Sequence, residues 1–202
     1  MELTAIFESW LVGDGNYPPL HRGQLVRLSF ELQPKRIATR QNGNASLFQH
    51  QGDAEYLGRG QVIRKYTETD ETIAVIAAGE FRFFIDAPAA ADLAVGDQIE
   101  FEGTLHLDHY VWVEFLGEYP DPPDLFYNLR VTRIRKVQVP ERFIQRQRDE
   151  KAKTYPAHVS PSDFGAVEEL ETMDGQRFDE EFYVIDFDSS GVETAQIPRT
   201  FL

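Results

Sequence analysis

Hydrophobic and polar residues alternate along most of this chain, which is the pattern of β-strands that bury one face. Turn-forming stretches such as Asn42-Gly43-Asn44 and Pro120-Asp121-Pro122-Pro123 separate the alternating segments. The predicted strands are Thr4–Val12, Gln24–Leu32, Gly60–Tyr66, Thr72–Ile76, Glu80–Ile85, Gln98–Leu105, Tyr110–Leu116, Leu125–Val139 and Glu181–Phe187. The pattern therefore predicts an all-β or β-rich α+β fold, built as an antiparallel barrel or sandwich.

Two segments add other elements to this pattern. Pro140-Glu141-Arg142-Phe143 predicts the start of one short helix that runs to about Lys153, because proline loses no hydrogen bond at the first helical position. Asp174-Gly175 lies between Glu169–Met173 and Phe178–Phe187, which is typical of a C-terminal hairpin with a type I′ turn. A short helix capped by Ser160-Pro161-Ser162-Asp163 is the alternative, and we favour the hairpin.

The domain organisation follows from these elements. Residues 1–150 are the predicted β-rich body, and residues 151–202 are an acidic C-terminal extension that carries the hairpin and packs on the body. Residues 151–162 contain two prolines and no periodicity, so they are the candidate linker. One compact body is favoured over two separable domains, because no long flexible linker interrupts the strands before Lys151.

A faint repeat with an offset of 73 residues would divide the body into residues 1–73 and 74–146. Trp10-Leu11-Val12 aligns with Phe83-Phe84-Ile85, and Leu20-His21-Arg22-Gly23 aligns with Leu93-Ala94-Val95-Gly96. The shared unit is a glycine turn that leads into a strand with alternating buried positions. Either the chain contains duplicated β units, or two β-hairpins resemble each other by their common alternation.

The strands between Gly60 and Leu116 also fit the outline of a small Greek-key or OB-like barrel. The phrase Val95–Gly103 is of a kind found in many such barrels. Gly-Asp before a strand is common in all β proteins, so this phrase identifies no family.

The charge of the chain narrows the choice of partners. The 202 residues include 34 acidic and 20 basic side chains, which gives a net charge of -14. Residues 130–153 carry a local balance of +6, and residues 163–193 carry -10. Such a negative total disfavours nucleic acid and favours a basic protein partner. The acidic stretch could instead be a solvated face, or could pair with the basic stretch inside the molecule.

Several classes of protein are excluded or disfavoured. The chain has no cysteine, which excludes disulfides and thiolate metal sites. Its first residues lack the basic start and apolar stretch of a secretory signal, and its longest apolar runs fall far short of the ~20 residues of a membrane span. These features predict a cytoplasmic protein with no membrane segment.

The densest group of candidate functional residues lies between His106 and Glu114. If one strand ran straight through this segment, one face would present His106, Asp108, Tyr110, Trp112 and Glu114. An imidazole, two carboxylates and two aromatic rings suit a small ligand or a carbohydrate. A hairpin that turns at Leu107-Asp108-His109 would instead scatter these groups.

No motif for catalysis, metal binding or a cofactor accompanies these residues. The chain lacks Gly-x-Ser-x-Gly and a phosphate-binding loop. Asp186–Gly191 matches the start of a calcium loop, but Ile197 stands where the loop requires glutamate. We therefore predict no catalytic residue, no metal and no cofactor. The lack of these motifs favours a protein that is not an enzyme.

The basic stretch Arg130–Lys136 follows Phe126 and Tyr127. Basic and aromatic side chains on a β surface could bind single-stranded nucleic acid, with Arg133 and Arg135 as candidate ligand residues. Pairing of these arginines with the acidic segment 163–193 is the alternative that we favour.

Three functions are consistent with the sequence. The first is a protein-interaction module for a basic partner, a profile shared by immunity proteins that neutralise toxins; its steering charges would be Asp179, Glu180, Glu181, Asp186 and Asp188. The second is an OB-like barrel that binds an oligosaccharide or single-stranded nucleic acid. The third is an enzyme with an unfamiliar site near His106, Asp108 and Glu114.

Overall fold

The computed structural model describes most of the chain. The described residues are 1–13, 17–40, 46–68, 71–86, 88–107, 111, 115–138, 164–173 and 181–191. The helix predicted from Pro140, the candidate linker at 151–162 and the turn at Asp174-Gly175 lie outside the described residues.

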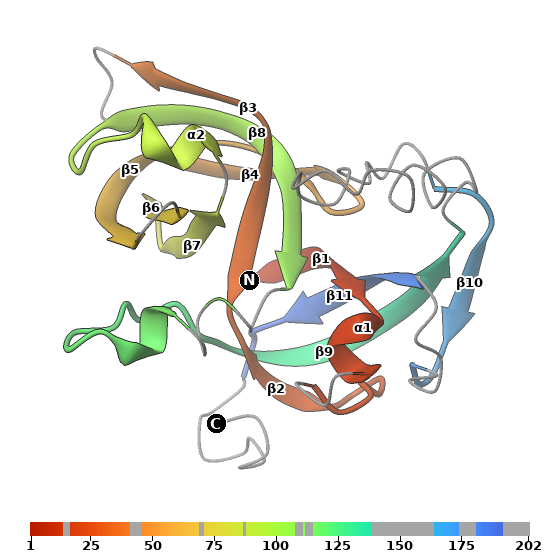
Figure 1. The fold of residues 1–202 in the computed structure, drawn as a ribbon. Coiled ribbons are helices and arrows are strands. Elements are labelled where there is room, and N and C mark those ends of the chain that lie inside the picture. Colours follow the sequence, from red (N-terminus) through yellow and green to blue (C-terminus); the bar gives the residue numbers. More distant parts are fainter. Residues whose placement is uncertain are drawn as a thin grey trace, which may run out of the picture. The chain divides into compact units, whose positions relative to one another are not determined.

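Strands make up most of the described chain (Figure 1). They are β1 (Glu2–Glu8), β2 (Leu25–Leu28), β3 (Phe30–Arg40), β4 (Leu47–Gly52), β5 (Glu55–Glu68), β6 (Glu71–Ala78), β7 (Phe81–Asp86), β8 (Gln98–Leu107), β9 (Tyr127–Val137), β10 (Val167–Leu170) and β11 (Phe182–Asp188). The described helical elements are short: α1 (Trp10–Gly13), α2 (Pro88–Ala91) and the 3-10 helix η1 (Leu116–Glu118). The prediction of an all-β, barrel-like fold is confirmed.

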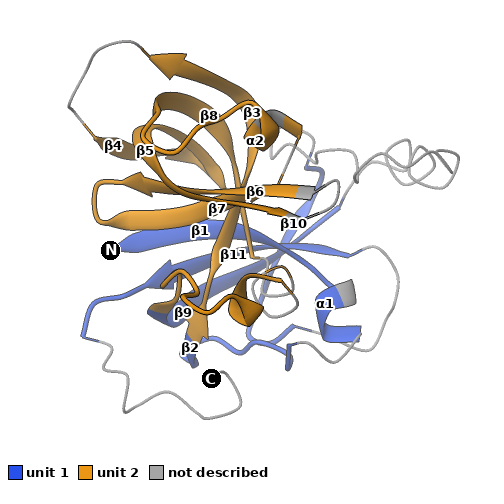
Figure 2. Cartoon of the chain, turned by 60° about the vertical axis from the view of Figure 1, so that its left-hand side comes forward, with its two compact units in different colours: residues 1–26, 128–202 blue, residues 27–127 orange. Residues whose placement is uncertain are grey.

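The chain divides into two compact units (Figure 2). Unit 1 comprises Met1–Val26 and Asn128–Leu202, and unit 2 comprises Arg27–Tyr127. The C-terminal strand β11 belongs with the N-terminus, because it pairs along the whole of β1, from Glu2 opposite Asp188 to Glu8 opposite Phe182. This division differs from the predicted one. The boundary predicted near residue 150 lies outside the described residues and stays a prediction.

In unit 1, the basic strand β9 lies between two acidic strands. Ile134 of β9 is opposite Leu170 of β10 on one side and opposite Ile185 of β11 on the other. The two C-terminal strands are therefore separated by β9, whereas the predicted hairpin had them paired with each other. This arrangement brings the carboxylates of both acidic strands to the cations of β9, which a hairpin would not do.

In unit 2, five strands close into a barrel. The long strand β5 pairs with β8 over Glu55–Gln61 and with β6 over Gln61–Glu68. β3 completes the ring, since it pairs antiparallel with β8 and parallel with β7, where Glu31 is opposite Phe84. Of the strand predicted at Tyr110–Leu116 the structure describes Val111, Phe115 and Leu116, and the prediction is wrong at these residues, because none of them lies in a strand and Leu116 begins the helical turn η1.

Aromatic rings fill one side of this barrel. The ring of Phe48 lies 4.5 Å from Tyr56 and 4.4 Å from Phe81, measured between centroids. Phe83 and Phe101 meet edge to face at 5.1 Å. This packing reaches the backbone of β5 at Gly58, where a Cβ atom would lie 2.2 Å from Cζ of Phe101 and 2.6 Å from the carbonyl oxygen of Leu47. Glycine is therefore required where β4 and β8 flank β5.

A second apolar cluster covers the outer face of β5, β6 and β7. Tyr66, Ile73, Val75 and Phe84 share this face and are buried under residues that follow β8; the covering residues include Leu116 and Leu125. The guanidinium of Arg64 donates to the carbonyl oxygen of Asp121 at 2.7 Å and to its carboxylate at 2.8 Å. These contacts hold the segment of residues 115–125 against the barrel.

The aligned segments of the predicted repeat agree in one place and differ in another. Gly23 and Gly96 both have positive φ angles, of 83° and 97°, and each precedes a strand. Trp10, in contrast, begins α1, whereas its aligned residue Phe83 lies within β7. The glycine turn is shared, and the duplication itself stays a prediction.

Tyr127 gives the fold a measurable response to alkaline pH. Its hydroxyl accepts the N–H of Arg82 at 2.5 Å and donates to the carbonyl oxygen of Arg82 at 3.2 Å. Burial raises the pKa of Tyr127 above its ordinary value of 10.0. The unfolded chain therefore loses this proton at a lower pH than the folded chain, so the stability that Tyr127 contributes is complete below its ordinary pKa and is lost as the pH rises above it.

We expect Tyr127→Phe to lower the free energy of unfolding by about 1 kcal/mol at neutral pH, because two hydrogen bonds are lost. The same variant should lose less stability than the parent between about pH 9 and pH 11. Urea unfolding at a series of pH values measures both effects. Parallel stability profiles for the two proteins would contradict the assignment.

Candidate functional site

The structure describes one of the five residues in the predicted ligand face at 106–114. His106 is buried in β8 and stands opposite Glu31 of β3, which is also buried. Asp108, Tyr110, Trp112 and Glu114 lie outside the described residues. Because β8 ends at Leu107, the described strand does not carry the five side chains on one face. The buried position of His106 favours a structural role, and the ligand site stays a prediction.

Arg133 and Arg135, the other predicted ligand residues, are engaged in ion pairs within unit 1. Arg133 Nε donates to Glu169 of β10 at 2.9 Å. Arg135 Nη2 donates to Asp186 of β11 at 2.9 Å. Lys136 pairs in the same way with Glu181. The predicted pairing of the basic stretch with the acidic C-terminal segment is confirmed for these residues.

Three of the predicted steering carboxylates therefore have partners in unit 1. Glu181 and Asp186 pair with β9, and Thr4 Oγ1 also donates to Asp186 at 2.8 Å. Asp188 lies 3.7 Å from the N-terminal amine, and the backbone N–H of Ser190, which donates to its carboxylate at 2.9 Å, lowers the pKa of Asp188. Asp179 and Glu180 lie outside the described residues. The steering role of the five residues stays a prediction.

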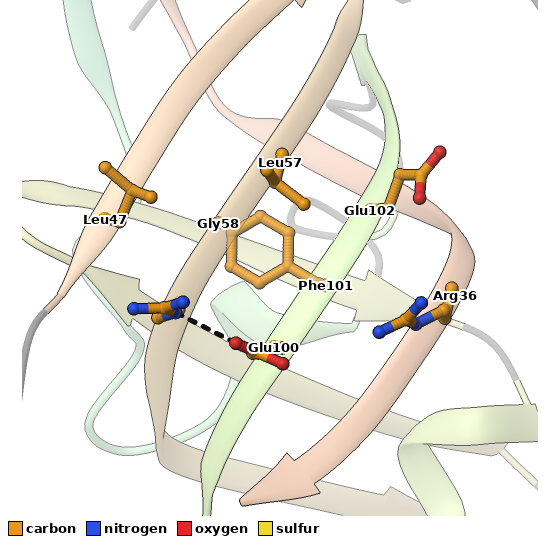
Figure 3. Close-up of a pocket in the computed structure, with 8 residues that line it drawn as sticks. Arg36, Leu47, Leu57, Gly58, Glu100, Phe101 and Glu102 are labelled. Atoms are coloured by element: carbon orange, nitrogen blue, oxygen red, sulfur yellow. Dashed lines mark hydrogen bonds and ion pairs between the residues drawn. The ribbon is translucent and has the colours of Figure 1, made fainter. Parts of the chain in front are cut away.

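Unit 2 carries an open groove on its outer face, over β4, β5, β8 and β3 (Figure 3). Strand register aligns the side chains on this face of the four strands in two rows, which include the charged and aliphatic residues of the groove. One row is Leu47, Arg59, Glu100 and Ala38, and the next is Gln49, Leu57, Glu102 and Arg36. The groove has a volume of about 210 Å³, which suits one large side chain rather than a cofactor.

The walls of this groove combine apolar and charged groups. Leu47 is 38% exposed and Leu57 is 41% exposed, although both are large aliphatic side chains. The carboxylate of Glu100 forms ion pairs with two arginines, Arg59 at 2.9 Å and Arg40 at 3.0 Å. Glu102 makes no ion pair with any residue that the structure describes. The charge of Glu100 is thus neutralised by the two arginines, whereas the carboxylate of Glu102 is available to a bound cation.

A second hollow, of about 200 Å³, lies between the barrel and the segment that follows η1. Arg64, Arg82, Asp121 and Asp124 contribute its charged lining. The charge of Arg64 is already matched by Asp121 at 2.8 Å. This hollow is therefore part of the contact that holds the segment of residues 115–125 against the barrel.

The groove over β5 and β8 was not predicted from the sequence. The predicted strand begins only at Gly60, because Gly58 and Gly60 interrupt the run of β-forming residues. In the structure β5 begins at Glu55, so Leu57 and Arg59 face outward from it. The available signal was the alternation of Tyr56, Gly58 and Gly60 with these two larger, outward-facing side chains.

Among the described residues, no group of three or more histidine or carboxylate side chains could hold a metal ion. No described helix is long and apolar enough to cross a membrane.

The chain was compared with protein families, curated proteins and solved structures. No family model matches it, and no curated protein or solved structure has significant similarity to it. Its function must therefore be argued from the geometry described above.

Proposed function

We propose that this protein is a binding module for a basic protein partner. The observation that carries the proposal is the pairing of Arg133, Arg135 and Lys136 with carboxylates of unit 1. These pairs occupy the most basic stretch of a chain whose net charge is -14. The excess carboxylates then determine the long-range field, which attracts a basic protein and repels a phosphate backbone.

Affinity capture tests this proposal. The tagged full-length protein is incubated with an extract of its own cells at low salt and eluted with a step to high salt, and the eluate is analysed for proteins and nucleic acids. We expect one enriched protein of high isoelectric point in the high-salt step. Predominantly acidic proteins or nucleic acid in that step would contradict the proposal.

A matched variant makes the test specific for the predicted steering charges. Asp179→Asn combined with Glu180→Gln removes two of the predicted steering charges and keeps Glu181 and Asp186, the carboxylates that pair with Lys136 and Arg135. We expect the association rate with the captured partner to fall several-fold at low salt, with little change in the dissociation rate. Arg27→Gln with Arg130→Gln is the control for altered surface charge, and it should raise the association rate.

An OB-like ligand-binding barrel is the second candidate, and the strand pairing supports it. The circuit β5–β6–β7–β3–β8–β5 places one parallel pair, β7 with β3, among antiparallel pairs. The short helix α2 follows the third strand, β7. An OB barrel that started at β5 and took β3 as its last strand would have these pairings.

The segment of residues 115–125, which lies over the barrel, argues against this second candidate. OB barrels bind oligonucleotides and oligosaccharides on the face of their second and third strands. The corresponding strands would be β6 and β7, whose outer residues Ile73, Val75 and Phe84 are buried under Leu116 and Leu125. Tight binding of a single-stranded oligonucleotide at physiological salt would nevertheless favour the barrel over the partner-binding module.

A further inference from the structure

The groove over β5 and β8 has the features of a pocket for a long cationic side chain. Leu47 and Leu57 supply exposed aliphatic surface, and the groove floor passes over Gly58 and Phe101. β4 is the last strand of the described sheet path, so no described strand closes the groove beyond Leu47. A side chain can therefore enter from the β4 side and lie across β5.

The charges of the groove favour a cation at one position. Glu100 is saturated by Arg40 and Arg59. Glu102 is directly opposite Leu57 in the register of β5 and β8, and no described residue forms an ion pair with it. Figure 3 shows the Glu102 carboxylate and the Arg36 guanidinium pointing in different directions, although the two residues are opposite each other across β8 and β3.

We propose that this groove receives a lysine or arginine side chain of the basic partner. The aliphatic stem lies on Leu47 and Leu57, and the terminal cation pairs with Glu102. Long cationic side chains bury their stems on apolar surface and keep their charged ends at a polar edge, which is the order of groups that the groove presents. Arginine is also one of the residue types enriched among those that dominate protein interfaces.

This inference rests on the proposed function and adds a specific contact to it. It also predicts whether each charged residue of the groove strengthens or weakens the binding of a cation. Glu102 attracts the cation and Arg36 repels it, so removing each charge should change the affinity in opposite directions.

The experiment is an NMR titration of the full-length protein with butylguanidinium, a small molecule that has both the stem and the cation. We expect saturable shifts at Leu47, Leu57 and Glu102. Methylguanidinium lacks the stem and should bind several-fold more weakly, and pentanoate, which carries the opposite charge, should not bind. No saturable shift at these residues, or equal binding of pentanoate, would overturn the proposal.

Charge variants complete the test. Glu102→Gln should weaken binding about fivefold, because it removes a charge-assisted hydrogen bond. Arg36→Gln should strengthen binding. Glu80→Gln and Arg82→Gln make the same changes in net charge at exposed positions outside the groove and should alter the affinity less than twofold. Equal changes of affinity in the groove variants and the control variants would show a general effect of net charge and would overturn the proposed site.

The outcomes separate this proposal from the function on which it rests. If Glu102→Gln binds the captured partner as tightly as the parent does, the groove is not the anchor site, and the binding module stands. If butylguanidinium binds the groove but no basic protein is captured, the pocket stands and the proposed function fails. Unchanged unfolding curves for Glu102→Gln confirm that the variant is folded.

Discussion

Replacing Gly58 with alanine is expected to destabilise the protein by about 2 to 3 kcal/mol. The new methyl group would stand 2.2 Å from the ring of Phe101 and 2.6 Å from the carbonyl oxygen of Leu47. Phe101 cannot swing away easily, because its ring is buried against Phe83. The strands β4 and β8 would therefore have to move apart from β5. Urea unfolding followed by circular dichroism measures the loss.

Gly79→Ala is the matched control for this prediction. Gly79 has a φ angle of 68°, and nothing lies within 4 Å of the position of a Cβ atom. Its alanine variant should lose about 1 kcal/mol through backbone strain alone. If Gly58→Ala is no less stable than Gly79→Ala, the close packing at Gly58 is not a constraint on the barrel.

Replacing Arg135 with leucine is the second change with a large expected effect. The Arg135–Asp186 pair joins β9 to β11 at 2.9 Å, and the two side chains are only 14% and 26% exposed. Removing the arginine leaves a half-buried carboxylate with Thr4 as a remaining hydrogen-bond donor. We expect a loss of about 2 kcal/mol, less than a fully buried pair would give because solvent screens part of the charge.

A double-mutant cycle distinguishes the loss of the pair from the loss of packing. Arg135→Leu combined with Asp186→Leu removes both charges and should be more stable than Arg135→Leu alone. Arg22→Leu breaks the exposed pair with Glu171 and should cost at most about 0.5 kcal/mol. Equal losses from Arg135→Leu and Arg22→Leu would show that the β9–β11 pair has no special role.

The fold class could be predicted because alternation of apolar and polar residues is a local signal. It identified strands such as those at Thr72–Ile76 and Glu80–Ile85, which became β6 and β7. It could not show which strands pair. Asp174-Gly175 suggested a hairpin by local turn chemistry, but β9 pairs with β10 on one edge and with β11 on the other, and its cations meet carboxylates of both strands.

The candidate site was harder to predict from the sequence than the fold class, for a related reason. The groove depends on the register that sets Leu57 opposite Glu102 and Arg59 opposite Glu100, residues more than 40 positions apart. No local pattern encodes such a register. The internal pairing of the basic stretch could be anticipated, because two blocks of opposite charge in one compact chain attract each other.

The salt dependence of binding to the captured partner tests the central claim most directly. The dissociation constant of the purified pair is measured by titration calorimetry at a series of ionic strengths. A net excess of carboxylates that attracts a basic protein predicts a dissociation constant that rises about tenfold or more between about 50 mM and 500 mM salt. A dissociation constant that stays constant, or that falls with added salt, would contradict recognition by charge and the account of this protein as a module for a basic partner.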